Sequence, residues 1–178
     1  MLINFEKIEI RRAAPDDARL VSVLATTTFY EAYFEQDDPA DLADYITASF
    51  EIESIRRQLE DPGSAFYILY TEGFAVGYAK LIYGSRDPSI AAAKTVELKR
   101  IYILERVWRK GLGKKLLEHC IAAARQLGGE SIWLGVWEEN IRGRSFYEKQ
   151  GFAKVGTLEF PYGDSVGINH VMEKKLLS

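Results

Sequence analysis

The chain has 178 residues, of which 47% are apolar and 28% charged, and its formal net charge is −3. These values predict a single globular domain over residues 1–178, and they exclude a largely disordered chain or a domain-wide basic surface for nucleic acid. No apolar run approaches the roughly 18 residues of a membrane span, so we expect neither membrane nor nucleic acid as a partner. Because Cys120 is the single cysteine, we expect a cytoplasmic protein.

Strand and helix patterns alternate along the chain. The first half predicts a strand, three helices and a two-stranded hairpin, at residues 5–13, 14–29, 38–50, 55–59, 64–72 and 74–83. The second half predicts a strand, a helix, a strand, a helix and two strands, at residues 95–104, 112–127, 131–137, 140–150, 152–160 and 166–176. Hairpins imply antiparallel pairs and helix–strand alternation implies parallel ones, so we predict an α/β (α+β) fold with one mixed sheet.

Two glycines, Gly111 and Gly113, stand where the predicted helix 112–127 begins, and bases flank them. The first turn of a helix has free N–H groups and the positive end of the helix dipole, which suits a phosphate. A tight turn with solvated lysines is the alternative, because Gly-x-Gly is a weak motif by itself. Two named phosphate loops do not fit: Lys115 replaces the Walker A Ser/Thr, and Leu116 replaces the third dinucleotide glycine.

The strand before this loop changes phase. Val96 and Leu98 are apolar at even positions, whereas Ile101 and Ile103 are apolar at odd ones. A one-residue slip around Lys99-Arg100 is typical of a β-bulge, which frees backbone groups to bind a ligand. The alternative is that both faces of the strand are buried, so that alternation carries no information.

Two segments, "VELKRIYILERVWRKGLGKKLLEH" and "GVWEENIRGRSFYEKQGF", together resemble the GCN5-related N-acetyltransferases (the GNAT family). The strand pattern "ELKRIYIL" is most similar to the PaiA-type bacterial spermidine/spermine acetyltransferases. The resemblance implies a single splayed sheet of six to seven strands flanked by about four helices. It implies an acetyl-CoA-dependent N-acetyltransferase with no metal.

The resemblance also assigns residues to the donor substrate, acetyl-CoA. The backbone of Ile101, Tyr102 and Ile103 would bind the pantetheine arm, and Asn140 would contact it as well. The pyrophosphate would lie on the backbone amides of Arg109, Lys110, Gly111, Leu112, Gly113 and Lys114. Arg144 or Lys149 is a guess from charge for the 3′-phosphate. One position departs from the family pattern: Trp108 stands where Gln or Arg is usual, which puts a side-chain phosphate contact there in doubt.

Acetyl transfer needs a neutral amine, a donor for the developing oxyanion and a proton for the leaving thiolate. Tyr147 has a pKa near ~10 as a free side chain and can protonate a thiolate whose thiol pKa is near ~8.5. The resemblance makes it the general acid; packing of an amphipathic helix on the sheet is its alternative. Glu97 is the candidate general base, and its alternatives are an exposed carboxylate or an ion pair with Lys99.

The acceptor is suggested by residues 20–55, which contain no Lys, Arg or His but eight acidic residues. Tyr30 and Tyr33 alternate with Glu31 and Glu35, and in the family this region lies on the acceptor side. Carboxylates and aromatic rings suit a cationic amine, so we predict a polyamine or another small primary amine. The alternative is that these acids only solvate helix surfaces.

Other functions remain compatible with the sequence. A protein N-terminus or lysine is a rival acceptor, and an acyl-CoA sensor without turnover or a nucleotide-binding module belongs to another class. Exposed aromatic residues near the C-terminal strands are compatible with a homodimer.

Overall fold

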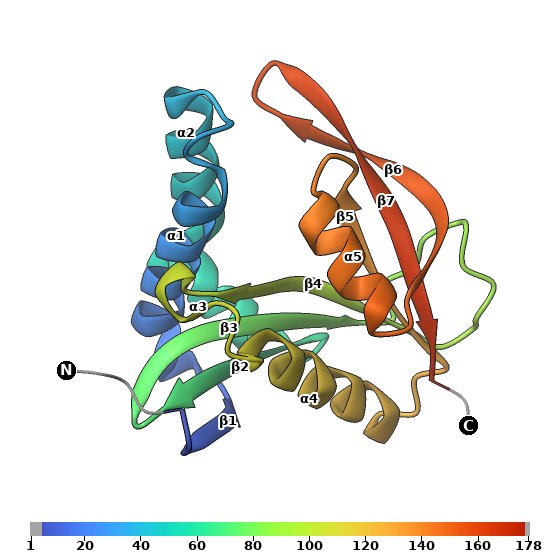
Figure 1. Cartoon of the computed structure of the whole chain (residues 1–178), viewed down its shortest axis with the longest axis horizontal. Coiled ribbons are helices and arrows are strands. Elements are labelled where there is room, and N and C mark those ends of the chain that lie inside the picture. Colours follow the sequence, from blue (N-terminus) through green and yellow to red (C-terminus); the bar gives the residue numbers. More distant parts are fainter. Residues whose placement is uncertain (1–4, 177–178) are drawn as a thin grey trace. The chain divides into compact units, whose positions relative to one another are not determined.

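The computed structural model describes residues 5–176 (Figure 1). This part of the chain forms an open sheet of seven strands, in the order β1-β2-β3-β4-β5-β7-β6, together with five α-helices. β4 and β5 run parallel, whereas the pairs β1–β2, β5–β7 and β6–β7 are antiparallel. The predicted α/β fold with one mixed sheet is therefore confirmed. Residues 1–4 and 177–178 of the predicted domain lie outside the described residues.

Every predicted element is present, with small shifts at the ends. The strands are β1 Ile8–Arg12, β2 Ser64–Thr71, β3 Phe74–Tyr83, β4 Thr95–Ile103, β5 Ser131–Trp137, β6 Ala153–Tyr162 and β7 Ser165–Lys175. The helices are α1 Ala18–Tyr33, α2 Pro39–Phe50, α3 Ile52–Glu60, α4 Leu112–Gln126 and α5 Ile141–Lys149, with short 3-10 turns η1 Pro15–Asp17 and η2 Glu105–Val107. α3 begins earlier than predicted because Glu51 both ends α2 and precedes the first turn of α3.

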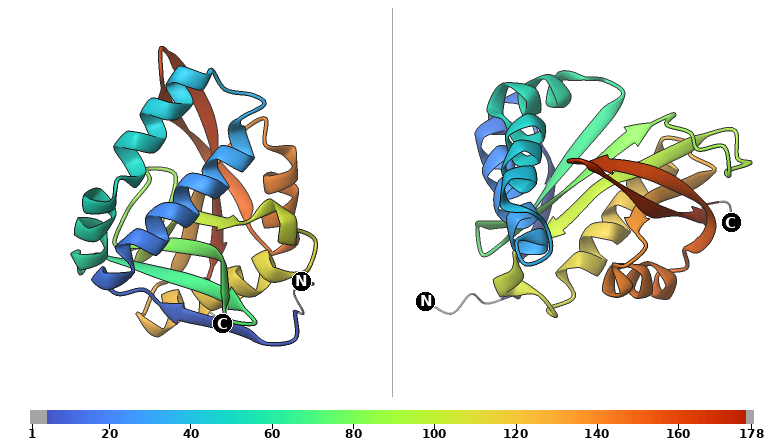
Figure 2. Two further views of the ribbon diagram at one scale, coloured as in Figure 1. Left: turned by 90° about the vertical axis from the view of Figure 1, so that its left-hand side faces the viewer. Right: turned by 90° about the horizontal axis from the view of Figure 1, so that it is seen from above.

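The described residues group into two compact units. The first contains the residues up to Lys80 and Arg100–His119. In it, α1 packs on α2 and α3, and α3 also contacts β2 (Figure 2). Its core includes Phe29, Phe50, Ile55 and Tyr78, each no more than 6% exposed. This unit holds both the predicted phosphate loop and the acidic segment.

An ion pair fixes the entry to α1 in this unit. The Arg11 guanidinium donates to both Asp17 carboxylate oxygens at 2.7 and 2.8 Å, and it lies 5.3 Å from the Tyr70 ring centroid. Asp17 also accepts from the Ala14 N–H at 2.8 Å. These bonds, led by that from Arg11, hold the pKa of the Asp17 carboxyl below its ordinary value.

The second unit contains Leu81–Lys99 and the chain from Cys120 onward. In it, β5 pairs with β4 only from Ser131 to Trp133 and with β7 along its whole length. β6 and β7 form the long hairpin seen in red in Figure 2, with a register shift between Lys154 and Gly156. On α4, Cys120 is fully buried, and burial raises the pKa of its thiol to about 12.

Candidate functional site

The loop before α4 has a backbone suited to an anion. Arg109 and Gly111 have φ of 62° and 74°, so left-handed residues flank Lys110. Lys115 N–H donates to the Gly111 carbonyl at 3.1 Å, which closes the first turn of α4. Backbone of alternating handedness turns successive N–H groups toward one side, and the first-turn amides of a helix lack acceptors within that helix. The loop therefore concentrates N–H donors where the positive end of the helix dipole lies.

The basic side chains of this loop have partners of their own. Lys114 pairs with Glu118 at 3.7 Å, with both side chains more than half exposed, and the Lys110 ammonium lies 5.5 Å from the Phe5 ring centroid. Exposed pairs of this kind are weak and leave the lysines free to move. The fixed part of the loop is its backbone.

The end of β4 presents one edge of its backbone away from β3. Leu104 N–H donates to the Val76 carbonyl at 2.9 Å, and a Cβ on Gly77 would meet the Tyr102 oxygen at 2.6 Å. Tyr102 therefore turns its backbone toward β3, and strand alternation turns that of Ile101 and Ile103 away.

Trp108, the residue that departs from the family pattern, forms a hydrogen bond to this edge. Its indole N–H donates to the Ile103 carbonyl at 2.7 Å. Of the three residues predicted to bind pantetheine, Ile101 thus offers both backbone groups to a ligand and Ile103 offers its N–H. This bond from the indole holds the loop to the end of β4.

In the second unit, the first half of β4 is buried on both faces, because Thr95, Val96, Glu97 and Leu98 are all buried. Alternation therefore carries no information there, as the alternative interpretation held. The parallel pairing with β5 stops at Glu97, and Leu98 and Lys99, which follow in the same unit, have no partner on β5. The bulge at Lys99-Arg100 stays a prediction.

Glu97, the candidate base, is 7% exposed, and both of its carboxylate oxygens have partners. One accepts from the Ser85 hydroxyl at 2.6 Å and the other from the Lys99 ammonium at 3.1 Å. The ion pair with Lys99 is thus present.

Asn140 caps α5, as its position predicts. Its side-chain oxygen accepts from the Gly143 N–H at 2.8 Å. A Cβ on residue 143 would lie 2.7 Å from the Asn140 Nδ2, so only glycine leaves room for this cap. Since the oxygen is engaged, the amide nitrogen is the group that Asn140 can offer to a ligand.

Tyr147 lies in the last turns of α5. Its ring is partly buried, between Phe146 at 5.2 Å and Phe152 at 5.7 Å between centroids. Its carbonyl accepts from the Phe152 N–H at 3.1 Å, where the helix stops at Gly151. The packing alternative therefore describes the ring, and the role of the hydroxyl as general acid stays a prediction.

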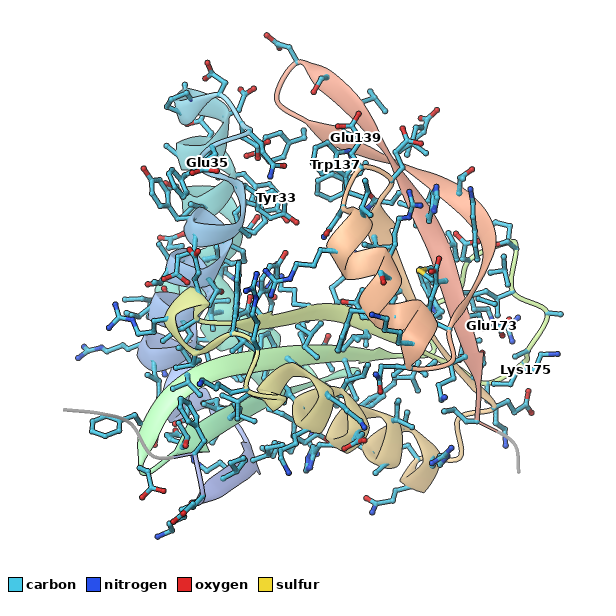
Figure 3. The ribbon with its side chains drawn as sticks, in the orientation of Figure 1. Tyr33, Glu35, Trp137, Glu139, Glu173 and Lys175 are labelled. Atoms are coloured by element: carbon cyan, nitrogen blue, oxygen red, sulfur yellow. The ribbon has the colours of Figure 1, made fainter. Side chains whose placement is uncertain are left out.

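The predicted acceptor residues on α1 separate into two kinds. Tyr30 is 54% exposed, and its ring stacks on Phe34 at 5.7 Å. Tyr33 is the last residue of α1, and Glu35 lies in the turn that follows it (Figure 3). Glu31 is different: its carboxylate accepts from the backbone N–H of Glu105 at 2.8 Å. Tyr30 and Glu35 are thus the exposed members of the predicted set.

Comparison with known proteins agrees with this geometry. Residues 24–152 match the model of the acetyltransferase (GNAT) family. The chain belongs to the GNAT family. It is an N-acetyltransferase, and an uncharacterized N-acetyltransferase of Mycobacterium bovis is 32% identical over 90% of this chain and 99% of its own. The spermine/spermidine N(1)-acetyltransferase of Bacillus subtilis is 36% identical, over 61% of this chain and 75% of its own.

Among solved structures, PaiA N-acetyltransferase from Thermoplasma acidophilum, crystallised with coenzyme A, has a TM-score of 0.75. The match has 23% identity and covers 95% of this chain and 99% of the other. The mixed seven-stranded sheet is therefore the GNAT fold.

This N-acetyltransferase also has a partly buried pair of tyrosines that the sequence did not indicate. The Tyr33 and Tyr102 side chains are hydrogen-bonded, and burial raises the pKa of both. Phe29 joins them, with ring centroids 4.5 Å from Tyr33 and 6.2 Å from Tyr102. The signal was present as the aromatic spacing of α1, but the partner on β4 lies 69 positions further along the chain. Tyr33 therefore joins α1 to the sheet.

Residues 5–176 contain neither a metal-binding cluster nor a membrane-spanning helix. In that range no group of three or more His, Cys, Asp or Glu side chains could hold a metal ion. Nor does any helix there combine the length and apolar character that crossing a membrane requires.

Proposed function

We propose that this N-acetyltransferase moves the acetyl group of acetyl-CoA to the primary amine of a small cationic acceptor, with a polyamine as the first candidate. The observation that supports acetyl-CoA as the donor is the loop of residues 109–114, where two left-handed residues lead into α4. A GNAT fold that binds coenzyme A in a neighbouring structure supports it. The cytoplasmic location and the homodimer stay predictions.

In this proposal the backbone holds the donor. The amides of residues 109–114 bind the pyrophosphate, and the open edge at Ile101 and the Ile103 N–H bind the pantetheine arm. Asn140 contributes its amide nitrogen. Within its own unit, the backbone of residues 101–114 is held by strand pairing and by the first turn of α4, which lowers the cost of ordering it around the ligand.

Acetyl transfer then proceeds by direct attack. The neutral amine nitrogen forms a bond to the acetyl carbon, and the bond from that carbon to the CoA sulfur breaks. Tyr147 gives its proton to the departing thiolate, and a backbone N–H on the edge of β4 stabilises negative charge on the acetyl oxygen. Once the N–C bond has formed, the nitrogen carries one proton too many, and Glu97 accepts that proton through water.

The acceptor proposal depends on α1. Tyr30 and Phe34 present stacked, exposed rings beside Glu35, and rings next to a carboxylate attract ammonium groups. The partial match to a spermine/spermidine acetyltransferase supports the same class of acceptor. The engaged carboxylate of Glu31 does not contribute to it.

A thiol-release assay with acetyl-CoA tests this proposal against spermidine, spermine, lysine, an aminoglycoside and N-terminal peptides. We expect turnover on the polyamines. Tyr147→Phe should lower kcat by about 100-fold or more while the affinity for CoA is unchanged, because general-acid catalysis contributes roughly that much. Tyr83→Phe, which removes a hydroxyl from the end of β3, is the matched control and should keep full turnover.

Other outcomes identify other functions. Turnover on peptides alone would replace the polyamine with a protein acceptor and keep the donor. CoA binding without turnover on any amine would favour the sensor, and protection by ATP in place of CoA would favour the nucleotide-binding module.

A further inference from the structure

We infer that Glu31 is a positioning residue for the phosphate loop and does not bind the acceptor; this rests on the proposed binding of acetyl-CoA. Its carboxylate reaches from α1 to the backbone N–H of Glu105, 74 positions later, at 2.8 Å. Glu105 is the first residue of the η2 turn. The contact therefore holds the start of the segment that leads into the loop.

The η2 turn has no cap of its own. Leu104 occupies the position before it and makes no capping bond with its apolar side chain. The N–H groups at the start of such a turn lack acceptors within it, and a carboxylate satisfies them best. Glu31 supplies that carboxylate from a distant helix.

Two further contacts hold the same turn. Val107, the last residue of the turn, is 2% exposed, so the end of the turn is fixed in the core of its unit. Trp108 follows the turn and donates to the Ile103 carbonyl. Glu31 thus holds the first residue of the turn, and Val107 and Trp108 hold its end.

The position of this turn matters because Arg109 comes only two residues after it. Arg109 is a non-glycine residue with φ of 62°, a conformation that persists only where the surrounding structure imposes it. The fixed turn on one side and the first turn of α4 on the other impose it. Loosening the turn at Glu105 would let Arg109 return to ordinary backbone angles, and the amides of the loop would then diverge.

Charge and geometry make opposite predictions for Glu31. A carboxylate near a pyrophosphate site repels the ligand, so its removal should tighten CoA binding if only charge mattered. A positioning carboxylate has the reverse effect, because its removal disorders the amides that bind the phosphates. The sign of the change in affinity therefore separates the two roles.

The test measures the dissociation constant of CoA by calorimetry for Glu31→Ala and Glu31→Gln. We expect Glu31→Ala to weaken CoA binding about 10-fold, roughly the value of one hydrogen bond to a charged group. Glu31→Gln keeps an oxygen that can accept from Glu105 and should keep the affinity. Glu60→Ala, an exposed acid on α3, is the control for loss of charge, and thermal melting checks that each variant is folded.

A second readout follows the Glu105 amide itself. Its hydrogen exchange should accelerate in Glu31→Ala and stay slow in Glu31→Gln. Unchanged or tighter CoA binding by a folded Glu31→Ala would overturn the assignment alone. So would a rise in the KM for spermidine in both variants at constant CoA affinity, because Glu31 would then be an acceptor ligand. A wild-type protein that binds no CoA would overturn the proposed function and the assignment together.

Discussion

Residues 101–114 and the end of α1 differ in what they would offer a ligand. The first segment presents backbone: an unpaired strand edge, left-handed turns and the amides of a helix start. The end of α1 presents side chains, among them Tyr30, Phe34 and Glu35. Backbone geometry tolerates side-chain change, whereas a side-chain surface changes with each substitution. The donor site can therefore be recognised from the fold, and acceptor choice depends on individual residues.

A substitution that changes the backbone conformation of the loop should have the largest effect on CoA affinity. Gly111→Ala places a Cβ at φ of 74°, in open space, so the substitution acts through backbone strain alone. We expect CoA affinity to fall by about 10-fold or more, because the strain of about 1–2 kcal/mol is relieved by moving the loop amides. Calorimetry with CoA measures this.

Gly84→Ala is the matched control for strain. Gly84 also has a positive φ, of 71°, and open space around its Cβ position, but it follows β3 in the other unit. It should lose the same stability and keep its affinity for CoA. Equal loss of affinity in both variants would mean that the loop has no special role in donor binding.

Removing an exposed side chain near the end of α1 should have a smaller effect, confined to the acceptor. Tyr30→Ala removes an exposed ring, and an exposed cation–π contact is worth about 0.5–1 kcal/mol. We expect the KM for spermidine to rise about 2- to 5-fold with the KM for acetyl-CoA unchanged, in steady-state kinetics. Val23→Ala, at a 62% exposed position on the same helix, should change neither. A parallel rise in both KM values after Tyr30→Ala would contradict the division between the two regions.

The smallest functional effect is expected at the entry to α1, where a change should alter stability alone. Asp17→Asn weakens the pairing with Arg11 and should lower the free energy of unfolding by about 1–2 kcal/mol at pH 7. Because the folded-state pKa of Asp17 is lowered, its contribution is complete above the ordinary pKa near 4 and disappears as the pH falls through the lowered value.

Denaturant unfolding from pH 7 to pH 2 measures this contribution, and the difference between variant and wild type should shrink toward the acid end. Asp44→Asn, at an exposed position on α2, should show no difference at any pH. A gap between Asp17→Asn and wild type that stays constant with pH would assign the effect to packing.

The sequence predicted the elements and the loop because these depend on local signals. Proline and acids marked the start of the first helical segment, Gly151 marked the end of α5, and Gly111 marked the turn before α4. Contacts between distant side chains could not be predicted in this way. The Glu97 carboxylate accepts hydrogen bonds from Ser85 as well as from Lys99. The periodicity of the strand gives no sign that a hydroxyl from the preceding loop lies near this carboxylate.

The same limit explains Trp108 and Glu31. The side chains of both residues form hydrogen bonds to backbone groups. Because every residue has the same backbone groups, the sequence does not reveal which residue is the partner. Trp108 was noted as a departure, and its bond to the Ile103 carbonyl became visible only with the fold. The acidic segment indicated a carboxylate-rich region for the acceptor, which stays a prediction, but it could not indicate that Glu31 is engaged by the Glu105 N–H.

The buried thiol of Cys120 has a practical consequence for enzymology. Thiolate is the form that reacts with disulfide reagents and alkylating agents, and a pKa of about 12 keeps Cys120 protonated at neutral pH. Because Cys120 is the only cysteine in the chain, the native protein should not react with such reagents. Colour developed during turnover then reports released coenzyme alone, and the enzyme should withstand storage without reductant.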